Sequence, residues 1–485
     1  MPTTSSTIQQ GLYIDGKWIY TSDTTPVLNK YTGQEIGTIS NASLADLDHA
    51  INTAQTHAKT IASMPANRRA DILLRTAEII KKEHETIAQT IAAESGKAMK
   101  FAKIEALRAV DTFTIAAEEA KRIHGETIPL DAVSCGEGYF GFWQRKPVGA
   151  VAAITPFNFP LNLVAHKVAP AIAAGNSVVL KPATTTPLTS GLLCQIMEKA
   201  GLPNGVLNLV HGSGSKIGTP LVSDPRIAKV TFTGSPEVGK HIIEHAGIKK
   251  VTLELGNNAP VIVCEDADLD LAAQKCVLGA FYNSGQICIS VQRIYVSEHL
   301  HDTFCDKLLA LTEKLIIGDP LDENTDVGPM IQQCEAERIE SWVDEATAAG
   351  ARVLIGGKRN NATYLPTLLT NVTPDMKVMA NEAFAPVACI TPFSDFNDVL
   401  AQADDSDYGL QAAIFTKDID RALLATQKLN FGGVIINEGP NFRADHMPYG
   451  GTRNSGLGRE GLRFAIEEMT NIQAVIIRSP SMDPS

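Results

Sequence analysis

The spacing of apolar and polar residues changes after the first third of the chain. Between Ser43 and Ile123, apolar residues recur at helical spacing, as in the segment 72–80, with arginines and lysines on either side. That period predicts several amphipathic helices. From Val148 onward, short apolar runs alternate with helix-like segments, which predicts parallel strands joined by right-handed crossovers.

The first alternating block is expected to hold strands with helices between them. In sheets of this kind, ligands bind at the carboxyl ends of the strands, so the loops that follow them are candidate sites. The predicted strands are 148–154, 177–180, 206–210, 227–232 and 251–255. The predicted helices are 161–174, 187–200, one between 210 and 227, and 236–246.

A second alternating block runs from Val261 to about Leu429, and two such blocks predict a two-lobed enzyme with a cleft between the lobes. After Glu467, the apolar run 472–477 is typical of a lone strand. A lone strand needs a partner, on this chain or on another subunit. The segment 136–146, which interrupts the first lobe, is the candidate.

Composition narrows the class of protein. The 485 residues include 42 Lys and Arg against 54 Asp and Glu, a net charge of −12, which argues against a nucleic-acid binder. The polar start, Met1 to Gln10, predicts no signal peptide, and no apolar stretch approaches the roughly 20 residues that cross a bilayer. The eight cysteines form no Cys-x-x-Cys pair, so we expect no metal site, and they favour a reducing, cytoplasmic location.

Cys288 has surroundings unlike those of the other cysteines. It lies in Asn-Ser-Gly-Gln-Ile-Cys-Ile-Ser, where a predicted helix ends at Tyr282 and Gly285 permits a tight turn before a strand at 289–296. A thiol at the tip of a turn is a candidate nucleophile. The alternative is an inert cysteine, which is the commoner case for a single thiol.

Two further polar residues lie at the ends of predicted strands. Glu254, in the strand 251–255, either faces solvent beside Lys249 and Lys250 or is a buried general base with a raised pKa. Asn158 follows the strand 148–154. Its amide either caps the next helix or donates to a developing oxyanion.

The segments 212–218 and 233–239 are rich in glycine, and each is expected to open a helix whose N–H groups suit a diphosphate. Neither matches Gly-x-Gly-x-x-Gly in full, and ordinary turns explain them equally well. Lys181 and the threonines after it follow another strand, where they suit ribose and phosphate groups or form a solvated turn.

Taken together and in order, these segments resemble the NAD(P)-dependent aldehyde dehydrogenase superfamily. The likeness extends from Tyr13 to the last strand, and its motifs are Pro-Phe-Asn-Phe-Pro, Lys-Pro-Ala, Phe-Thr-Gly-Ser, Glu-Leu-Gly, Gly-Gln-x-Cys, Asn-Glu-x-Phe-x-Pro and Pro-Tyr-Gly-Gly. The resemblance implies an α/β fold with a modified Rossmann cofactor lobe, an α/β catalytic lobe and a β-arm for oligomerisation. It places the dinucleotide-binding domain at 1–125 and 147–255, the catalytic domain at 256–466, and the arm at 126–146 and 467–485.

The resemblance also implies roles for single residues. Cys288 maps to the nucleophile, Glu254 to the general base, and Asn158 to the amide that supports the oxyanion. Cofactor contacts are implied for Lys181 at a ribose, Ser235 at the diphosphate, Glu382 at the nicotinamide ribose and Phe384 beside the ring. The other expected cofactor contacts are Thr155, Pro156, Phe157, Ala183, Thr184, Gly214, Gly218, Phe232, Thr233, Gly234, Val238 and Leu255.

The chain departs from the family pattern at three places. Asn257 and Asn258 follow Gly256 where many relatives have further glycine, and Ala385 stands where glycine is common. At Thr184, NAD-specific relatives often carry a glutamate that chelates the ribose and would repel a 2′-phosphate. A threonine removes that repulsion, so we expect both NAD and NADP to be used, without a metal.

The reaction implied by the family is oxidation of an aldehyde to the carboxylic acid. The Cys288 thiolate adds to the aldehyde carbon, and the thiohemiacetal gives up hydride to become a thioester. Glu254 then deprotonates the water that releases the acid. Relatives that pass the acyl group to coenzyme A tend to lack this glutamate, so we expect the free acid.

The segment 436–449 resembles the branch that contains lactaldehyde and sulfolactaldehyde dehydrogenases. Arg443 and His446 are expected at the distal end of the substrate, with Asn162 and His166 lining the same mouth. An inward-facing Arg443 favours a short aldehyde with a carboxylate, sulfonate, phosphate or hydroxyl tail. The alternative is a surface pair of Arg443 with Asp445 or Glu438.

Other functions stay open at this point. One is a succinate-semialdehyde or broad-range aldehyde dehydrogenase. Another is a catalytically silent binding or structural relative, although such a protein is expected to have lost Cys288 or Glu254. A cysteine hydrolase needs a histidine beside the thiol, for which His446 and His166 are candidates. The expected partners are a small-molecule aldehyde and further copies of the chain in a homodimer or homotetramer, with no nucleic acid or membrane.

Overall fold

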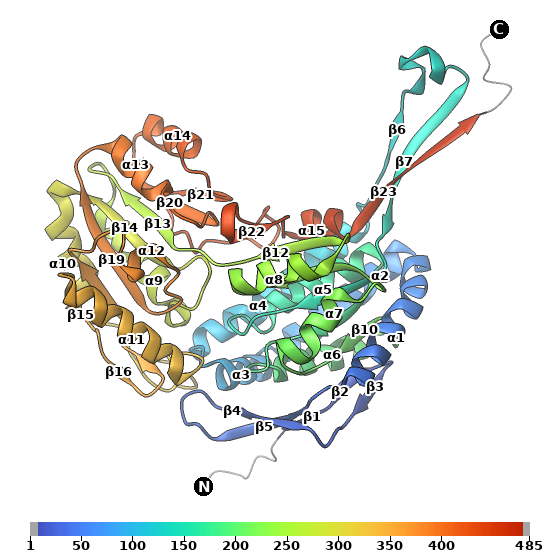
Figure 1. Ribbon diagram of the computed structural model, residues 1–485, viewed down its shortest axis with the longest axis horizontal. Helices are drawn as coiled ribbons and strands as arrows, with labels where there is room; N and C mark the ends of the chain where they lie inside the picture. The colour runs from blue at the N-terminus through green and yellow to red at the C-terminus, as the bar shows by residue number, and fades with distance from the viewer. Residues whose placement is uncertain (1–7, 479–485) are drawn as a thin grey trace.

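Two large sheets form the centre of residues 8–478, the part of the chain that the computed structural model describes. One has eight strands in the order β22-β12-β11-β8-β9-β10-β2-β3, and the other has seven in the order β15-β18-β19-β14-β13-β20-β21. Figure 1 shows two bodies side by side, each with helices packed on its sheet. The expected α/β fold is confirmed, while the domain boundaries given above stay predictions.

The strands of the first body include all five that the apolar runs predicted. The eight-stranded sheet consists of β2 (Leu12–Ile14), β3 (Lys17–Ile19), β8 (Ala150–Ile154), β9 (Ser177–Lys181), β10 (Leu207–Leu209), β11 (Ile227–Thr233), β12 (Lys250–Glu254) and β22 (Gly456–Leu457). The seven-stranded sheet consists of β13 (Ala259–Val263), β14 (Val291–Ser297), β15 (Arg352–Ile355), β18 (Thr367–Thr370), β19 (Val387–Phe393), β20 (Gln411–Phe415) and β21 (Gly433–Ile436).

The middle of the eight-stranded sheet is parallel, as predicted. β8 pairs in parallel with β9 and with β11, and β11 pairs in parallel with β12. The register sets Ile154 opposite both Lys181 and Phe232, and Thr233 opposite Glu254. The carboxyl ends of four strands therefore meet at one edge of the sheet, where the polar residues singled out above are found.

The helices follow the predicted periods closely. Ser43 caps the first helix through a capping box with Asp46, and Gly175 ends the helix at 162–174 in a left-handed conformation, with φ of 90°. The first body has α1 (Leu44–Ser63), α2 (Ala66–Lys82), α3 (His84–Ser95), α4 (Met99–Ala120), α5 (Asn162–Ala174), α6 (Leu188–Lys199), α7 (Thr219–Ser223) and α8 (Pro236–Ala246). The rest of the chain has α9 (Leu269–Phe281), α10 (His301–Thr312), α11 (Gln333–Ala348), α12 (Lys377–Ala380), α13 (Phe396–Asp404), α14 (Ile419–Lys428) and α15 (Leu462–Glu468).

The helix predicted between 210 and 227 differs from expectation, because it has two parts. Gly214–Gly218 forms a π-helical turn, and Ser213 accepts a hydrogen bond from the Lys216 N–H at its start. Only then does the short helix α7 begin. Gly214 and Gly218, at the two ends of this turn, both line the cavity described below.

The lone strand predicted near the C-terminus finds its partner in the same chain. β23 (Thr470–Arg478) pairs antiparallel with β7 (Tyr139–Pro147), which also pairs with β6 (Glu126–Ile128). The predicted mate, 136–146, is therefore correct apart from its ends. Figure 1 shows the three strands projecting from the body as an arm.

Small sheets complete the fold of the described residues. β1 (Ile8–Gln10), β5 (Glu35–Ser40) and β4 (Thr24–Leu28) form a three-stranded sheet, and β16 (Arg359–Asn360) pairs with β17 (Thr363–Tyr364). Within residues 8–478, no helix has the length and apolar character needed to span a membrane. Residues 1–7 and 479–485, which include most of the polar start and the end of the predicted arm, lie outside the described residues.

Candidate functional site

A cavity of about 1150 Å³ opens where the parallel strands of the eight-stranded sheet end. Its wall combines residues that follow β8, β9 and β11 with residues from the loops around the seven-stranded sheet. Asn158, Lys181, Cys288 and Glu382 all line it, although they come from distant parts of the sequence. The fold therefore brings most of the candidate residues into one space.

Cys288 reaches this cavity on an unusually shaped loop. After α9 ends at Phe281, Asn283, Ser284 and Gly285 all adopt positive φ values, of 51°, 55° and 69°. Side chains are costly at such angles, so the loop is held by its surroundings. A Cβ at Gly285 would overlap the carbonyl oxygen of Ala385, so only glycine fits there.

The loop also explains why the next strand begins later than predicted. β14 starts at Val291 rather than 289, because residues 286–290 complete the turn. The side chain of Gln286 bonds the chain on both sides, donating to the Asn283 carbonyl at 3.2 Å and accepting from the Ile331 N–H at 2.9 Å. Cys288 thus projects into the cavity from a fixed backbone.

The thiol of Cys288 lies in largely apolar surroundings. Its Sγ is 3.0 Å from the hydroxyl of Tyr449, its hydrogen-bond partner among the described residues. Burial raises the pKa of the Cys288 thiol to about 12, and the hydrogen bond with Tyr449 opposes that rise. No histidine contacts the sulfur, so the cysteine hydrolase alternative lacks its base within residues 8–478.

Asn158 lies beside the same loop. Its Nδ2 donates to the carbonyl oxygen of Gln286 at 2.9 Å, and its Oδ1 is buried without a partner. It makes no capping bond with α5, so the helix-capping alternative is wrong. The amide is instead fixed next to the thiol, on the wall of the cavity.

Glu254 ends β12 and is 2% exposed, so the solvent-facing alternative is wrong. Within residues 8–478, neither of its carboxylate oxygens has a hydrogen-bond partner. Burial, with Glu460 nearby, raises the pKa of Glu254 well above its usual value, although Arg443 and Lys167 oppose the rise. Glu254 does not line the cavity itself. It sits directly behind Gly450, where a Cβ would come within 2.9 Å of its Oε1.

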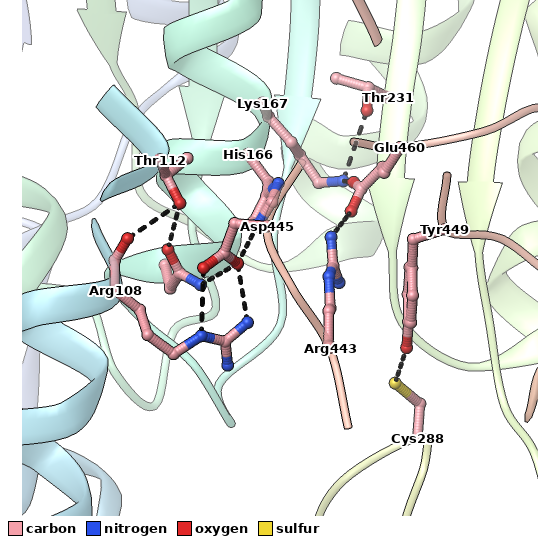
Figure 2. A network of polar contacts seen from close by, with 11 residues as sticks. Arg108, Thr112, His166, Lys167, Thr231, Cys288, Arg443, Asp445, Tyr449 and Glu460 are labelled. Carbon is pink, nitrogen blue, oxygen red and sulfur yellow. Dashed lines mark hydrogen bonds and ion pairs between the residues drawn. The ribbon is translucent and has the colours of Figure 1, made fainter. Parts of the chain in front are cut away.

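A network of buried charges borders the thiol, as Figure 2 shows. Nη2 of Arg443 lies 3.1 Å from Glu460 Oε2, and Nζ of Lys167 lies 2.7 Å from Glu460 Oε1. Arg443 also stacks on Tyr449, with Cζ 3.7 Å from the ring centroid. The Nε of Arg443 is buried without a partner.

Asp445 is the centre of the second half of the network. It accepts from Arg108 at 2.7 Å, from His166 at 2.8 Å and from Asn162 at 3.2 Å. Since Asp445 is taken by these groups, and Glu438 pairs with Lys275 instead, the surface pairing suggested for Arg443 is wrong. These bonds hold the pKa of Asp445 well below its usual value.

The four candidate substrate residues fall into two groups. Arg443 and Asn162 line the cavity. His166 is buried and bonds Asp445, and His446 is exposed, and neither residue is part of the cavity wall. Helical spacing placed His166 near Asn162 correctly but gave no information about which side chain reaches the open space.

Among the cavity residues that sequence reasoning missed, two are close to the candidate site residues. Arg108, on α4, and Tyr449 both line the wall. Arg108 gave no signal, because its partner Asp445 is 337 positions away. Tyr449 was identified only as part of the Pro-Tyr-Gly-Gly motif, and the motif did not indicate a role for its hydroxyl.

The candidate cofactor residues gather along one side of the cavity, with a single exception. Thr184 is not part of the wall, and its neighbour Thr185 is. The residues of the prediction that do line it are Thr155, Pro156, Phe157, Lys181, Ala183, Gly214, Gly218, Phe232, Thr233, Gly234, Ser235, Val238, Leu255, Glu382 and Phe384.

This side of the cavity has polar groups without protein partners. The hydroxyls of Thr155 and Thr233 are buried and unbonded. Lys181 is 7% exposed, and burial lowers its pKa to about 8, with the Pro182 carbonyl at 3.4 Å as its acceptor. Such a wall suits a ligand with hydroxyls and negative charge.

Glu382 occupies the end of this side that is nearest the thiol. One carboxylate oxygen accepts from the Asn257 N–H at 2.9 Å, and burial raises the pKa of Glu382 to about 8. Asn257 and Asn258, which depart from the family pattern, bond the carbonyls of Gln411 and Met379. These amides tie the turn after β12 to the other body.

Comparison with known proteins gives a consistent result. The sequence model of the aldehyde dehydrogenase family matches residues 18–475. A 3-sulfolactaldehyde dehydrogenase of Priestia aryabhattai is 47% identical, over 97% of this chain and 98% of its own length.

Solved structures agree. Aldehyde dehydrogenase 21 from Physcomitrella patens, in complex with the reaction product succinate, has a TM-score of 0.95 at 40% identity, covering 98% of this chain and 99% of its own. A glyceraldehyde-3-phosphate dehydrogenase from Methanocaldococcus jannaschii, complexed with NADP, has a TM-score of 0.91 at 41% identity, covering 95% and 100%.

Proposed function

The chain belongs to the aldehyde dehydrogenase family, and we propose that it oxidises a short polar or anionic aldehyde, of the sulfolactaldehyde or lactaldehyde type, to the carboxylic acid. The enzyme is an NAD(P)-dependent dehydrogenase, and solved structures similar to it hold NADP or NAD. The natural aldehyde and the residue roles that follow are part of the proposal.

Cys288 is the nucleophile in this proposal. Its thiolate attacks the aldehyde carbon, and the C=O π electrons move to the oxygen to give a thiohemiacetal anion. Asn158 Nδ2 and the backbone N–H of Cys288 stabilise that oxygen. The position of Asn158 beside the Cys288 loop, at the wall of the cavity, supports this assignment.

The cofactor fits the polar side of the cavity. Lys181 and the hydroxyls of Thr155 and Thr233 supply partners for ribose and phosphate groups, and Ser235 begins α8, whose N–H groups suit a diphosphate. When bound, the nicotinamide accepts the hydride. Glu382 and Phe384 orient that end of the cofactor, and the Cys288 adduct becomes a thioester.

Glu254 is the general base for release of the acid. Its carboxylate has no hydrogen-bond partner and a raised pKa, both of which suit a group that takes a proton from water. The water oxygen attacks the thioester, the carbon–sulfur bond breaks, and Cys288 leaves as thiolate. The charged neighbours of Glu254 have opposite effects on its pKa: Glu460 raises it, and Arg443 and Lys167 lower it. The two cations therefore favour the ionised carboxylate.

The proposed class of substrate rests on the buried guanidinium of Arg443. It lines the cavity, its Nε lacks a partner, and Glu460 takes only one of its N–H groups in a hydrogen bond. A planar donor with free N–H groups suits a sulfonate, carboxylate or phosphate. Arg108 lines the same cavity and donates two hydrogen bonds to Asp445.

The test is reduction of NAD and of NADP at 340 nm with a panel of aldehydes. The panel contains sulfolactaldehyde, lactaldehyde, succinate semialdehyde, glyceraldehyde 3-phosphate and a plain alkanal. We expect kcat/KM to be highest for an anionic member with a short chain. Equal rates on the alkanal would overturn the anionic preference, and acyl-CoA as the main product in the presence of coenzyme A would overturn the role of Glu254.

Succinate semialdehyde is the second candidate. The similar plant enzyme was solved with succinate, a product that carries the second carboxylate of this substrate. It fits the same cations, and the panel separates the two by chain length and by the type of anion.

A further inference from the structure

The hydroxyl of Tyr449 is the polar group that contacts the Cys288 sulfur, and the proposed mechanism gives it no task. Oη and Sγ are 3.0 Å apart, and Tyr449 is 3% exposed. Apolar side chains pack around this pair, among them Phe159, Leu163 and Ile289. A hydroxyl held against a thiol in such surroundings affects the charge state of the sulfur.

We propose that Tyr449 is a catalytic residue whose hydroxyl donates a hydrogen bond to the Cys288 thiolate and so makes the nucleophile available. This inference rests on the proposed role of Cys288. The phenol stabilises the thiolate without taking its proton. When sulfur becomes bonded to the aldehyde carbon, its charge is lost and the hydrogen bond weakens, so the contact favours the reactive form of the free enzyme.

The direction of the hydrogen bond follows from the two acids. Burial and the neighbouring thiol raise the pKa of Tyr449 well above its usual value, so the phenol keeps its proton. Once the thiol has lost its proton, the sulfur can only accept a hydrogen bond. Tyr449 is then the donor and Cys288 the acceptor.

The charged groups around the sulfur have opposing effects on the thiolate, so its stabilisation depends mainly on Tyr449. Glu382 and Glu254 oppose ionisation of the thiol, and Arg443, which lies over the face of the Tyr449 ring, favours it. Among the described residues, Tyr449 is the only hydrogen-bond donor to Sγ. Without it, the thiolate would stand in an apolar cluster with two carboxylates nearby.

Tyr449 is held in place from two sides. Its backbone exchanges hydrogen bonds with Glu460, at 3.0 Å and 2.7 Å, and the guanidinium of Arg443 lies against the face of its ring. Figure 2 shows Arg443 beside the face of the ring and the Tyr449 hydroxyl directed at the Cys288 sulfur. A fixed donor adds little ordering cost when the thiolate forms.

The test is the pH dependence of alkylation of Cys288 by iodoacetamide, with the labelled peptide identified by mass spectrometry. In Tyr449→Phe, we expect the apparent pKa of the thiol to rise by about one to two units, and labelling at a fixed lower pH to slow about 10- to 100-fold. Tyr282→Phe is the matched control. It removes a hydroxyl from the same cavity that makes no bond with Sγ, and its profile should match the wild type.

A second variant tests the same contact without removing the hydroxyl. Incorporation of 3-fluorotyrosine in place of Tyr449 makes the phenol a stronger donor and should lower the apparent pKa of the thiol. A Tyr449→Phe profile that overlays the wild type, or a pKa that falls because the thiol was the donor, would overturn the proposal. Cys288→Ser tests the proposed nucleophile separately from the role of Tyr449. If this variant keeps dehydrogenase activity, Cys288 is not the nucleophile. The alkylation profiles of the Tyr449 variants test only whether Tyr449 stabilises the thiolate.

Discussion

Arg443 and Glu460 form an ion pair inside the protein, with Nη2 and Oε2 3.1 Å apart and side chains only 7% and 2% exposed. Glu460 is also bonded by Lys167, whereas the Nε of Arg443 has no partner. The Glu460 carboxylate is thus bonded twice, whereas Arg443 donates one hydrogen bond to it and also lines the cavity. This asymmetry supports the proposed role of Arg443 toward an anionic substrate.

Replacing Arg443 with Met removes the charge and keeps much of the apolar stem. We expect kcat/KM for an anionic aldehyde to fall about 10- to 100-fold, and that for a plain alkanal to change little, because a charge-assisted hydrogen bond is lost only with the anion. Steady-state kinetics with both substrates measures this. Arg443→Lys is the control, since it restores charge without the planar fork, and an equal loss on both aldehydes would contradict the assignment.

Replacing Glu254 with Gln should stop turnover after the first hydride transfer. Stopped-flow absorbance at 340 nm is expected to show a burst of about one cofactor per active site, followed by a steady rate lower by about 10²- to 10⁴-fold. Because the pKa of Glu254 is raised, its basic form increases with pH, so thioester hydrolysis in the wild type should accelerate as pH rises. A Gln variant that keeps this dependence would show that another group is the base.

Lys181 should make the use of NADP depend on pH. Burial lowers its pKa to about 8, so its charge is present at pH 7 and is progressively lost as pH rises through that value. We expect the KM for NADP, relative to that for NAD, to increase between pH 7 and pH 9. Lys181→Met should remove this trend. A flat KM ratio in the wild type would mean that Lys181 does not meet the 2′-phosphate.

His211 should make stability depend on pH. It is 1% exposed, and burial with Lys181 nearby lowers its pKa to about 3. Between that value and the ordinary pKa of 6.5, the unfolded chain binds a proton that the folded chain does not, so stability is highest above 6.5 and falls with acidification. The free energy of unfolding should drop by about 2 kcal/mol between pH 6.5 and pH 5.

Urea unfolding at several pH values measures this slope. In His211→Gln, the number of protons taken up on unfolding should fall by about one, so the free energy of unfolding depends less on pH. Part of the remaining pH dependence is due to His166, whose pKa is lowered as well. An unchanged slope in the variant would show that the ring titrates normally.

Local patterns predicted most of the backbone. The helix at 236–246 and the pairing of the C-terminal strand with the segment near 139–147 followed from apolar spacing and from the need of a lone strand for a partner. The π-helical turn at Gly214–Gly218 did not follow, because glycine spacing fits several turn types equally well. The residues that follow the parallel strands were found because that topology collects them at one edge.

The charge network was beyond sequence reasoning. Asp445 joins Arg108 on α4 to His166 on α5, and no periodicity links positions so far apart. The environment of His166 depends on how α5 packs beside Asp445, and that of His446 depends on the loop that follows β21. The position of Arg443 at the cavity could be predicted, but its partner Glu460 could not, since nearer acidic residues were equally good candidates.

The contact between Gly285 and Ala385 has a consequence for protein engineering. The loop that carries Cys288 rests on the segment that carries Glu382 and Phe384, closely enough that no side chain fits at Gly285. The two segments therefore form one structural unit. A chimera with a homologue that exchanges one of them and keeps the other would place the sulfur and the nicotinamide end of the cofactor out of alignment, so crossover points belong outside the interval from 285 to 385.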